Sequence, residues 1–273
     1  MYLSYFGLDE FPFSITPDTQ FACNVTSHEE ALNTLLLAVQ GGEGFVKITG
    51  EVGAGKTLLC RKLLSLLGDD RVAAYVPNPQ LEPRAMLAEV AAELGADPGS
   101  DATMLVKAIN RRVLEIAAQG KTAVLCIDEA QTMPPLTLQT LRMLSNLETE
   151  KRKLIQIVLF GQPELDQILG EKSARQVLQR ITFHYRMPGL ARHELNVYLQ
   201  HRMRIAGYRG PSLFSRAARW ALYRHSRGMP RLVNVLAHKA LLAAFGRGAE
   251  RVGYHHVRVA ARDTESAFNR AWF

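Results

Sequence analysis

The chain has 273 residues, of which 47% are hydrophobic and 22% are charged, and its formal net charge is +7. This apolar content is sufficient for packed cores and excludes a disordered chain. Its three cysteines, which are odd in number and widely spaced, exclude a disulfide framework and a CxxC metal site, and they indicate a reducing, cytoplasmic compartment.

The N-terminus, residues 1–18, lacks the basic start and apolar run of a secretory signal. The longest apolar stretches, such as residues 237–245 and 123–127, fall well short of the roughly 20 residues that cross a bilayer. We therefore expect no transmembrane segment, and any membrane association would be peripheral or through a partner.

Charge is distributed unevenly along the chain. Residues 1–170 carry 14 Lys and Arg against 21 Asp and Glu, whereas residues 171–273 carry 19 against 5. This shift indicates a domain boundary and a contact with nucleic acid, acidic protein or anionic lipid. A solvated, arginine-rich helical surface explains the charge equally well.

Strands and helices alternate in the first two thirds of the chain. Ser27 and Glu30 have the spacing of a capping box that opens a helix before the first strand. Strands are predicted at residues 45–49, 72–76, 123–127, 154–160 and 182–185, and helices at 56–67, 84–94, 104–118 and 136–147. The alternation predicts an α/β fold, with a parallel sheet covered by helices on both faces.

After Pro188 only helical patterns follow, at residues 192–206, 213–225, 231–245 and 254–262. A small all-helical domain is the simplest account of these short-looped amphipathic segments. We therefore predict an α/β nucleotide-binding domain at residues 1–187 and a basic helical domain at 188–273.

The segment GEVGAGKT, residues 50–57, matches GxxxxGK[ST] and lies between a predicted strand and a predicted helix. In such a P-loop, backbone N–H groups surround an anion, Lys56 reaches the β- and γ-phosphates, and Thr57 places its hydroxyl on Mg²⁺. The alternative is a chance glycine-rich turn. The predicted contacts to ATP are Gly50, Glu51, Val52, Gly53, Ala54, Gly55, Lys56, Thr57 and Leu58.

Asp128 and Glu129 end the apolar strand at residues 123–127, at the sheet edge where open α/β folds bind ligands. We predict that Asp128 binds Mg²⁺ and that Glu129 is the general base for the attacking water. The alternative is a carboxylate pair that caps the next helix. Gln131 is a weaker candidate.

A P-loop, a DEAQ segment and a helical C-terminal domain together resemble the AAA+ ATPases. The resemblance implies that Gln162, after the strand at 154–160, is sensor 1, although it could be an ordinary turn residue. It also implies that Arg231, in the GMPRxxN segment at 228–234, is the sensor 2 residue of a lid and closes onto the nucleotide.

Arg180, in QRI before the last strand, matches the family position of an arginine finger that reaches into a neighbouring subunit. The resemblance therefore implies a homo-oligomer. Arg175 and Arg186 are rival candidates, and a surface salt bridge would explain any of the three.

The N-terminus narrows the resemblance to the ExeA-type branch. It carries the branch's aromatic and proline residues, and GEGFVKITGEVGAGKTLLCRKLL and CIDEAQ agree with it. By this resemblance Phe13 and Pro17 contact the adenine, although core packing would also use such residues and is favoured for Phe6. The N-terminal residues that carry this likeness are Tyr2, Phe6, Gly7, Leu8, Pro12, Phe13 and Pro17.

The branch implies a role in type IV, MSHA-like pilus biogenesis or a related secretion assembly, with platform proteins at the inner membrane as partners. ExeA-type secretion ATPases continue into a transmembrane helix and a peptidoglycan-binding domain, whereas this sequence ends at Phe273. The expectation is a shorter cytoplasmic form, anchored through a partner if at all.

The alternative function is that of a DNA-binding AAA+ regulator, such as a transposition helper ATPase, which the basic C-terminal third would suit. No winged-helix or helix-turn-helix motif is recognisable, although residues 255–262 could form a basic helix face. His255 and His256 do not suggest a metal site, because adjacent histidines do not share a helix face.

Overall fold

A computed structural model describes residues 2–15, 20–21, 23, 25–97, 101–148 and 152–268. Contacts divide the chain into two compact units. The sheet unit comprises residues 28–50 and 59–187, and the helical unit comprises the described parts of residues 1–27, 51–58 and 188–273.

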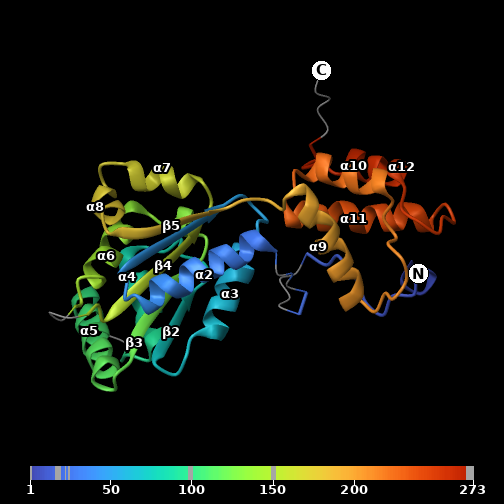
Figure 1. The fold of residues 1–273 in the computed structure, drawn as a ribbon. Coiled ribbons are helices and arrows are strands. Elements are labelled where there is room, and N and C mark those ends of the chain that lie inside the picture. Colours follow the sequence, from blue (N-terminus) through green and yellow to red (C-terminus); the bar gives the residue numbers. More distant parts are fainter. Residues whose placement is uncertain are drawn as a thin grey trace. The chain divides into compact units, whose positions relative to one another are not determined.

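The sheet unit is built on five parallel strands in the order β2-β3-β4-β1-β5 (Figure 1). Every residue of β1 is buried, because this strand has neighbours on both sides and helices above and below. The predicted parallel α/β fold is confirmed. The strands are β1 (Phe45–Gly50), β2 (Arg71–Val76), β3 (Thr122–Ile127), β4 (Ile155–Gly161) and β5 (Ile181–Met187).

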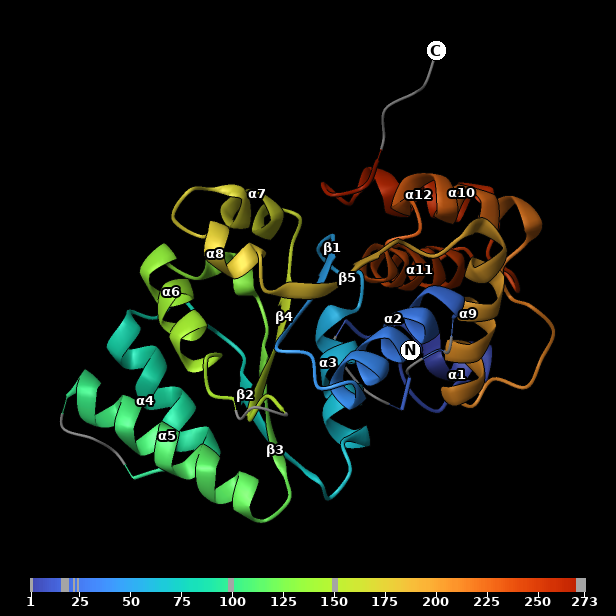
Figure 2. The ribbon, with the colours of Figure 1, turned by 60° about the vertical axis from the view of Figure 1, so that its left-hand side comes forward.

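Helices cover both faces of this sheet, as Figure 2 shows with the sheet between two layers. One layer contains α2 (Thr26–Gln40) and α3 (Lys56–Leu66). The other face packs on the apolar side chains of α4 (Pro83–Leu94), α5 (Ala102–Ala118), α6 (Pro135–Leu144), α7 (Glu164–Gly170) and α8 (Arg175–Leu178). The two short helices α7 and α8 were not predicted, since neither is long enough to show a helical period.

The carboxyl ends of the strands lie at a common edge of the sheet. Thr49 pairs with Gly161 of β4 and with Arg186 of β5, and Ile127 of β3 pairs with Leu159 of β4. Residues that directly follow these strands are therefore brought to one edge, where ligands of open α/β sheets bind.

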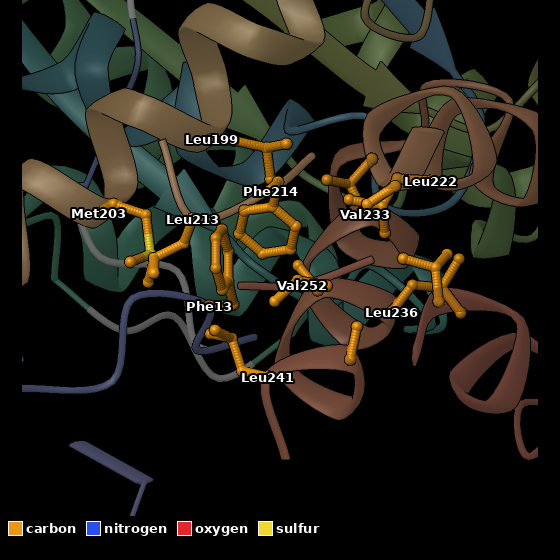
Figure 3. Packing of buried hydrophobic residues seen from close by; sticks show 14 of the residues in the cluster. Phe13, Leu199, Met203, Leu213, Phe214, Leu222, Val233, Leu236, Leu241 and Val252 are labelled. Carbon is orange, nitrogen blue, oxygen red and sulfur yellow. The ribbon is translucent and has the colours of Figure 1, made fainter. Parts of the chain in front are cut away.

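The helical unit has its own apolar core. Phe13 and Phe214 meet there edge to face, with ring centroids 5.8 Å apart (Figure 3). The unit contains α1 (Tyr2–Phe6), α9 (Arg192–Ile205), α10 (Arg216–Ser226), α11 (Pro230–Phe245) and α12 (Tyr254–Arg262).

The N-terminal segment packs within this helical core, whereas the sequence-based domain boundary grouped it with the sheet. Tyr2 and Phe6 are buried, as aromatic side chains of this size prefer. The buried guanidinium of Arg202 donates to the carbonyl oxygens of Pro12 (2.6 Å) and Ser14 (3.3 Å). These bonds satisfy a buried charge and hold the segment.

Helix α2 begins at Thr26, one residue before the predicted cap, so the predicted capping box is wrong. Ser27 lies inside the first turn. The backbone N–H of Thr26 donates instead to Oε1 of Glu194, at 3.0 Å. A carboxylate far away in the sequence therefore satisfies this helix end, and the local spacing could not reveal it.

Helix α10 begins at Arg216 and not at residue 213. Ser215 is its N-cap, because its Oγ accepts a hydrogen bond from the N–H of Ala218 at 3.1 Å. The preceding residue, Phe214, forms an isolated parallel bridge with Val252. The apolar pair before Ser215 was taken for a helical stripe but belongs to an extended, buried segment.

All three cysteines are free and buried. The Cys60 thiol, in α3, shares a hydrogen bond with Cys126 of β3, and this bond together with burial raises the pKa of Cys60. The Cys60 thiol therefore stays protonated. Among the described residues, no helix combines the length and the apolar character that crossing a membrane requires.

Candidate nucleotide-binding site

The P-loop is a tight turn between the end of β1 and the start of α3. Gly53 and Gly55 adopt φ values of +79° and +101°, which residues with a Cβ rarely adopt. Lys56 is the first residue of α3 and is only 5% exposed, and its Nζ donates to the carbonyl oxygen of Glu51 at 3.1 Å. A buried ammonium at a helix N-terminus suits a bound polyphosphate.

Arg231 lies against this loop within the helical unit. Its backbone N–H donates to the carbonyl oxygen of Gly53 at 3.2 Å, and a Cβ built on Gly53 would lie 2.3 Å from the Cβ of Arg231. Glycine at position 53 is therefore required by packing as well as by its φ value. Pro230, which precedes Arg231, fits the first turn of α11. Backbone N–H groups in a first turn have no partner within the helix, so the missing N–H of proline costs no hydrogen bond there.

A cavity of about 750 Å³ adjoins the two, within the range of small-molecule sites. The P-loop contributes Glu51 and Val52, and α11 contributes Arg231 together with apolar side chains. The cavity thus combines an apolar wall with a cation, as a nucleotide requires. Its remaining lining residues are Arg227, Met229, Leu232, Val235, Ser266 and Phe268.

Asp128 and Glu129 follow β3 at the carboxyl edge of the sheet. Asp128 is 2% exposed, and its Oδ1 accepts a hydrogen bond from the Glu129 N–H at 2.9 Å. Glu129 has a φ of +50°, a left-handed conformation that costs energy for a residue with a Cβ. Such strain is concentrated at functional sites, which supports a role for this pair beyond helix capping.

Two glutamines hold the Glu129 carboxylate. Nε2 of Gln131 donates to Oε2 of Glu129 at 2.6 Å, and Nε2 of Gln162 donates to the same oxygen at 3.2 Å. The Gln162 N–H in turn donates to Oε1 of Gln131 at 2.9 Å. Gln131, the weaker candidate from the sequence, is therefore central, and its position two residues after Glu129 in DEAQ was the available signal.

The two predicted Mg²⁺ ligands are both oxygen donors. The predicted ligands, the hydroxyl of Thr57 and the buried carboxylate of Asp128, are hard donors, and Mg²⁺ is commonly held by one or two such groups together with substrate phosphates. Within the described residues there is no cluster of three or more His, Cys, Asp or Glu that could hold a metal by itself.

Arg180 forms a side-chain hydrogen bond within the sheet unit. It follows α8, and its Nη1 donates to Oγ of Ser145 at 3.0 Å, while Arg175 and Arg186 are exposed. Arg180 directly precedes β5 in the sequence, and its action on a neighbouring subunit stays a prediction.

Phe13 is 2% exposed and packs on Phe214, which supports the packing alternative for this residue. Pro17, the other predicted adenine contact, lies outside the described residues.

A polar network beside the sheet edge was not predicted. Lys47, buried in the middle of β1, forms an ion pair with Asp166 of α7 at 2.5 Å. Oγ1 of Thr49 and Nε2 of His184 lie 3.2 Å apart, and burial together with Lys47 lowers the pKa of His184. Lys47 was overlooked because its neighbours in the strand are apolar.

Comparison with known families identifies the domain that carries this site. The family model described as an AAA domain matches residues 39–169. The match covers just under half of the chain and includes the P-loop together with Asp128, Glu129 and Gln162. The match agrees with the AAA-type ATPase that the sequence predicts.

Among curated proteins, the chain is similar to "General secretion pathway protein A" of Aeromonas hydrophila. The two are 41% identical over 263 residues, which make up 96% of this chain and 48% of the relative. This chain thus spans about half the length of that protein. The similarity agrees with the ExeA-type resemblance.

Solved structures share the fold at low identity. Cdc6p of Pyrobaculum aerophilum gives a TM-score of 0.68 at 18% identity, over 93% of this chain and 72% of the other. The ORC2 protein of Aeropyrum pernix gives 0.64 at 20% identity, over 92% and 72%. RuvB of Thermotoga maritima gives 0.56 at 15% identity, over 93% and 73%. The helical part is therefore included in the shared fold.

Proposed function

We propose that this chain couples ATP hydrolysis to the assembly of a type IV, MSHA-like pilus or a related secretion machine. The sequence resembles MshM, the ATPase of MSHA pilus biogenesis, and the proposed role is the one that this resemblance implies. The observation that carries the proposal is the 41% identity to General secretion pathway protein A across 96% of the chain. Its localisation would be cytoplasmic, peripheral at the inner membrane through platform proteins.

In this proposal the P-loop holds ATP. The backbone N–H groups of residues 51–57 and the ammonium of Lys56 bind the phosphates, and Arg231 closes onto them from the first turn of α11. The close packing of Gly53 against Arg231 supports this arrangement, because both residues belong to one compact unit. Leu58, which follows Thr57 in the first turn of α3, completes the predicted contacts.

Glu129 is proposed as the general base. Its carboxylate would accept a proton from the attacking water, whose oxygen then bonds to the γ-phosphorus as the bond to ADP breaks. The hydrogen bonds that the side-chain amides of Gln131 and Gln162 donate to this carboxylate would orient it toward the water. Mg²⁺, held by Thr57 and Asp128, would neutralise phosphate charge.

Arg180 would complete the site of a neighbouring subunit, which makes the proposed active form a homo-oligomer. A guanidinium supplied to the transferred phosphate stabilises charge that develops in the transition state. The bond from Arg180 to Ser145 would position the side chain at the start of β5.

The experiment is a pull-down from the native organism with tagged Glu129→Gln, which should bind ATP without hydrolysing it. Pilus or secretion platform proteins should co-purify in the presence of ATP. A Lys56→Ala bait, which should not bind ATP, is the matched control and should recover much less of them. Recovery of transposition proteins in place of platform proteins would overturn the proposed role.

A further inference from the structure

The helical unit carries a second concave surface, formed by α9 and α10. Two cavities of about 550 and 340 Å³ are both lined by Arg192 and Trp220, so they adjoin along these two helices. We call this surface the Trp220 groove. It is lined by Arg192, His193, Leu195 and Asn196 of α9 and by Arg216, Arg219, Trp220, Tyr223 and Arg224 of α10.

The contribution of α10 is a continuous stripe along one face of the helix. Counted from Arg216, the lining residues lie at positions 0, 3, 4, 7 and 8, which is the spacing of side chains that share a helix face. At 1.5 Å per residue, the stripe from Arg216 to Arg224 is about 12 Å long. Cations therefore stand at both ends of the stripe, with Trp220 between them.

The groove is strongly positive and has no internal counter-charge. No lining residue is acidic, and within the described part of the chain none of the groove's arginines takes part in an ion pair. Arg219 donates to Oγ of Ser212 at 3.2 Å, a neutral partner. Repulsion among these cations opposes folding, and an anionic ligand would relieve it.

Two aromatic residues, Trp220 and Tyr223, lie between the cations of the stripe. Trp220 is 41% exposed, and the guanidinium of Arg224 lies 5.3 Å from its ring centroid. Asn196 adds a buried Oδ1 that has no hydrogen-bond partner in the described structure. The groove thus offers cations for phosphates, a ring for stacking and a free acceptor for an N–H donor.

We propose that the Trp220 groove binds single-stranded nucleic acid. Arg192, Arg216 and Arg224 contact phosphates, and a base lies against Trp220. The exposed ring of Trp220 can stack on an unpaired base of a single strand, whereas the bases of a duplex are already stacked on one another. An acidic peptide would match the charges but would leave the aromatic surface of Trp220 without a flat partner.

This property is independent of the proposed secretion role. A strand held by the helical unit does not need the P-loop, so binding should occur with the full chain in the presence or absence of ATP. Failure of the groove to bind a strand would leave the ATPase and its platform partners untouched.

The test is fluorescence anisotropy of a labelled oligothymidylate titrated with the full chain at 50 and 200 mM salt. Three phosphate contacts predict about 20-fold weaker binding at the higher salt, because counterions are released from a single strand. Arg192→Glu/Arg216→Glu should bind at least tenfold more weakly at 50 mM and lose most of the salt dependence. Arg209→Glu/Arg247→Glu is the matched control, since both arginines are exposed and neither lines the groove.

Trp220→Ala should weaken binding about tenfold or more, as expected for the loss of one stacked base, and Trp220→Phe should restore most of it. The absence of oligothymidylate binding at 50 mM salt would overturn the proposal. Equal loss in the control pair would also overturn it, as would binding of phosphatidylglycerol vesicles or polyglutamate with higher affinity than the oligonucleotide. Circular dichroism and ATP binding verify that each variant is folded.

Discussion

The backbone N–H of Arg231 donates a hydrogen bond to the carbonyl oxygen of Gly53, at 3.2 Å. The first turn of α11 is thereby joined to the P-loop through main-chain atoms, whatever the position of the Arg231 guanidinium. A change in the loop on nucleotide binding would be felt by α11 directly, and the contact leaves no room for a side chain at Gly53.

Gly53→Ala should therefore impair ATP binding by more than the backbone cost of an alanine with a positive φ. The backbone cost is about 1–2 kcal/mol, and the clash with the Cβ of Arg231 adds to it and displaces the loop. We expect at least tenfold weaker ATP binding by calorimetry. Gly42→Ala is the control, since Gly42 has nearly the same φ, +78°, but no atom within 4 Å of an added Cβ. Equal ATP affinities in the two variants would contradict this prediction.

Lys56→Ala should weaken ATP binding more than tenfold, since it removes the buried ammonium from the loop. Equilibrium binding of a fluorescent ATP analogue measures the effect. Lys62→Ala, on the same helix and less buried, should bind as the unchanged protein does. An unaltered affinity of Lys56→Ala would argue against the P-loop as the phosphate site.

Glu129→Gln should keep ATP binding and lower kcat by about 100-fold or more, the scale of general-base catalysis. The neutral amide oxygen can still accept from Gln131 and Gln162 but cannot take up the water proton. Steady-state phosphate release measures kcat. Turnover near that of the unchanged chain would exclude Glu129 as the base.

Gln131→Ala tests the positioning of that base. It removes one of the two donors to the Glu129 carboxylate, so kcat should fall by less than in Glu129→Gln while KM stays close to its original value. Phosphate release over a range of ATP concentrations separates the two constants. A change confined to KM would show that Gln131 acts on binding and not on the base.

Arg180→Ala should lose ATPase activity, and mixing with inactive Lys56→Ala subunits should partly restore it. In mixed oligomers a Lys56→Ala subunit would supply Arg180 to an intact P-loop of its neighbour. Arg175→Ala and Arg186→Ala, prepared in the same way, identify the finger among the three candidates. Activity that stays absent at every mixing ratio would refute a role in trans.

The stability of the helical unit should fall in mild acid because of His256. Its Nδ1 lies 3.0 Å from the Gly253 N–H and accepts from it, and burial together with Arg247 lowers the pKa of this imidazole. The unfolded chain therefore binds the proton more readily, so stability is complete above about pH 6.5 and is lost as the pH falls below it.

Urea unfolding at pH 7.5 and 5.5 checks this, with a loss of about 1 kcal/mol expected for the cap of α12. His256→Asn should reduce the pH dependence without abolishing it, because the pKa values of His184 and His238 are also lowered. A pH dependence that is identical in His256→Asn would rule out this origin.

The sheet was predictable because each buried strand is a short apolar run that ends at a polar or glycine residue. The run at 123–127, followed by Asp128, agrees with β3 to within one residue. The same feature predicted that Asp128, Glu129 and Gln162 lie at the sheet edge, because a residue that follows a buried parallel strand lies at the carboxyl edge of the sheet.

Contacts between distant segments could not be predicted in this way. The carboxylate of Glu194 that satisfies Thr26 lies 168 positions away in the sequence, and the Asp166 partner of Lys47 lies 119 away. A single sequence shows which residue types need partners but not which residue supplies them. The hydrogen bond between Gln162 and Gln131, 31 positions apart, and the packing of the N-terminal segment were not predicted for the same reason.

The three buried thiols have a practical consequence for spectroscopy. Because Cys23, Cys60 and Cys126 are all shielded in the folded chain, a maleimide dye would react first with cysteines introduced at exposed positions. One label at Arg111 of α5 and one at Arg258 of α12 would leave the native cysteines in place. Energy transfer between the labels could then be measured with and without ATP.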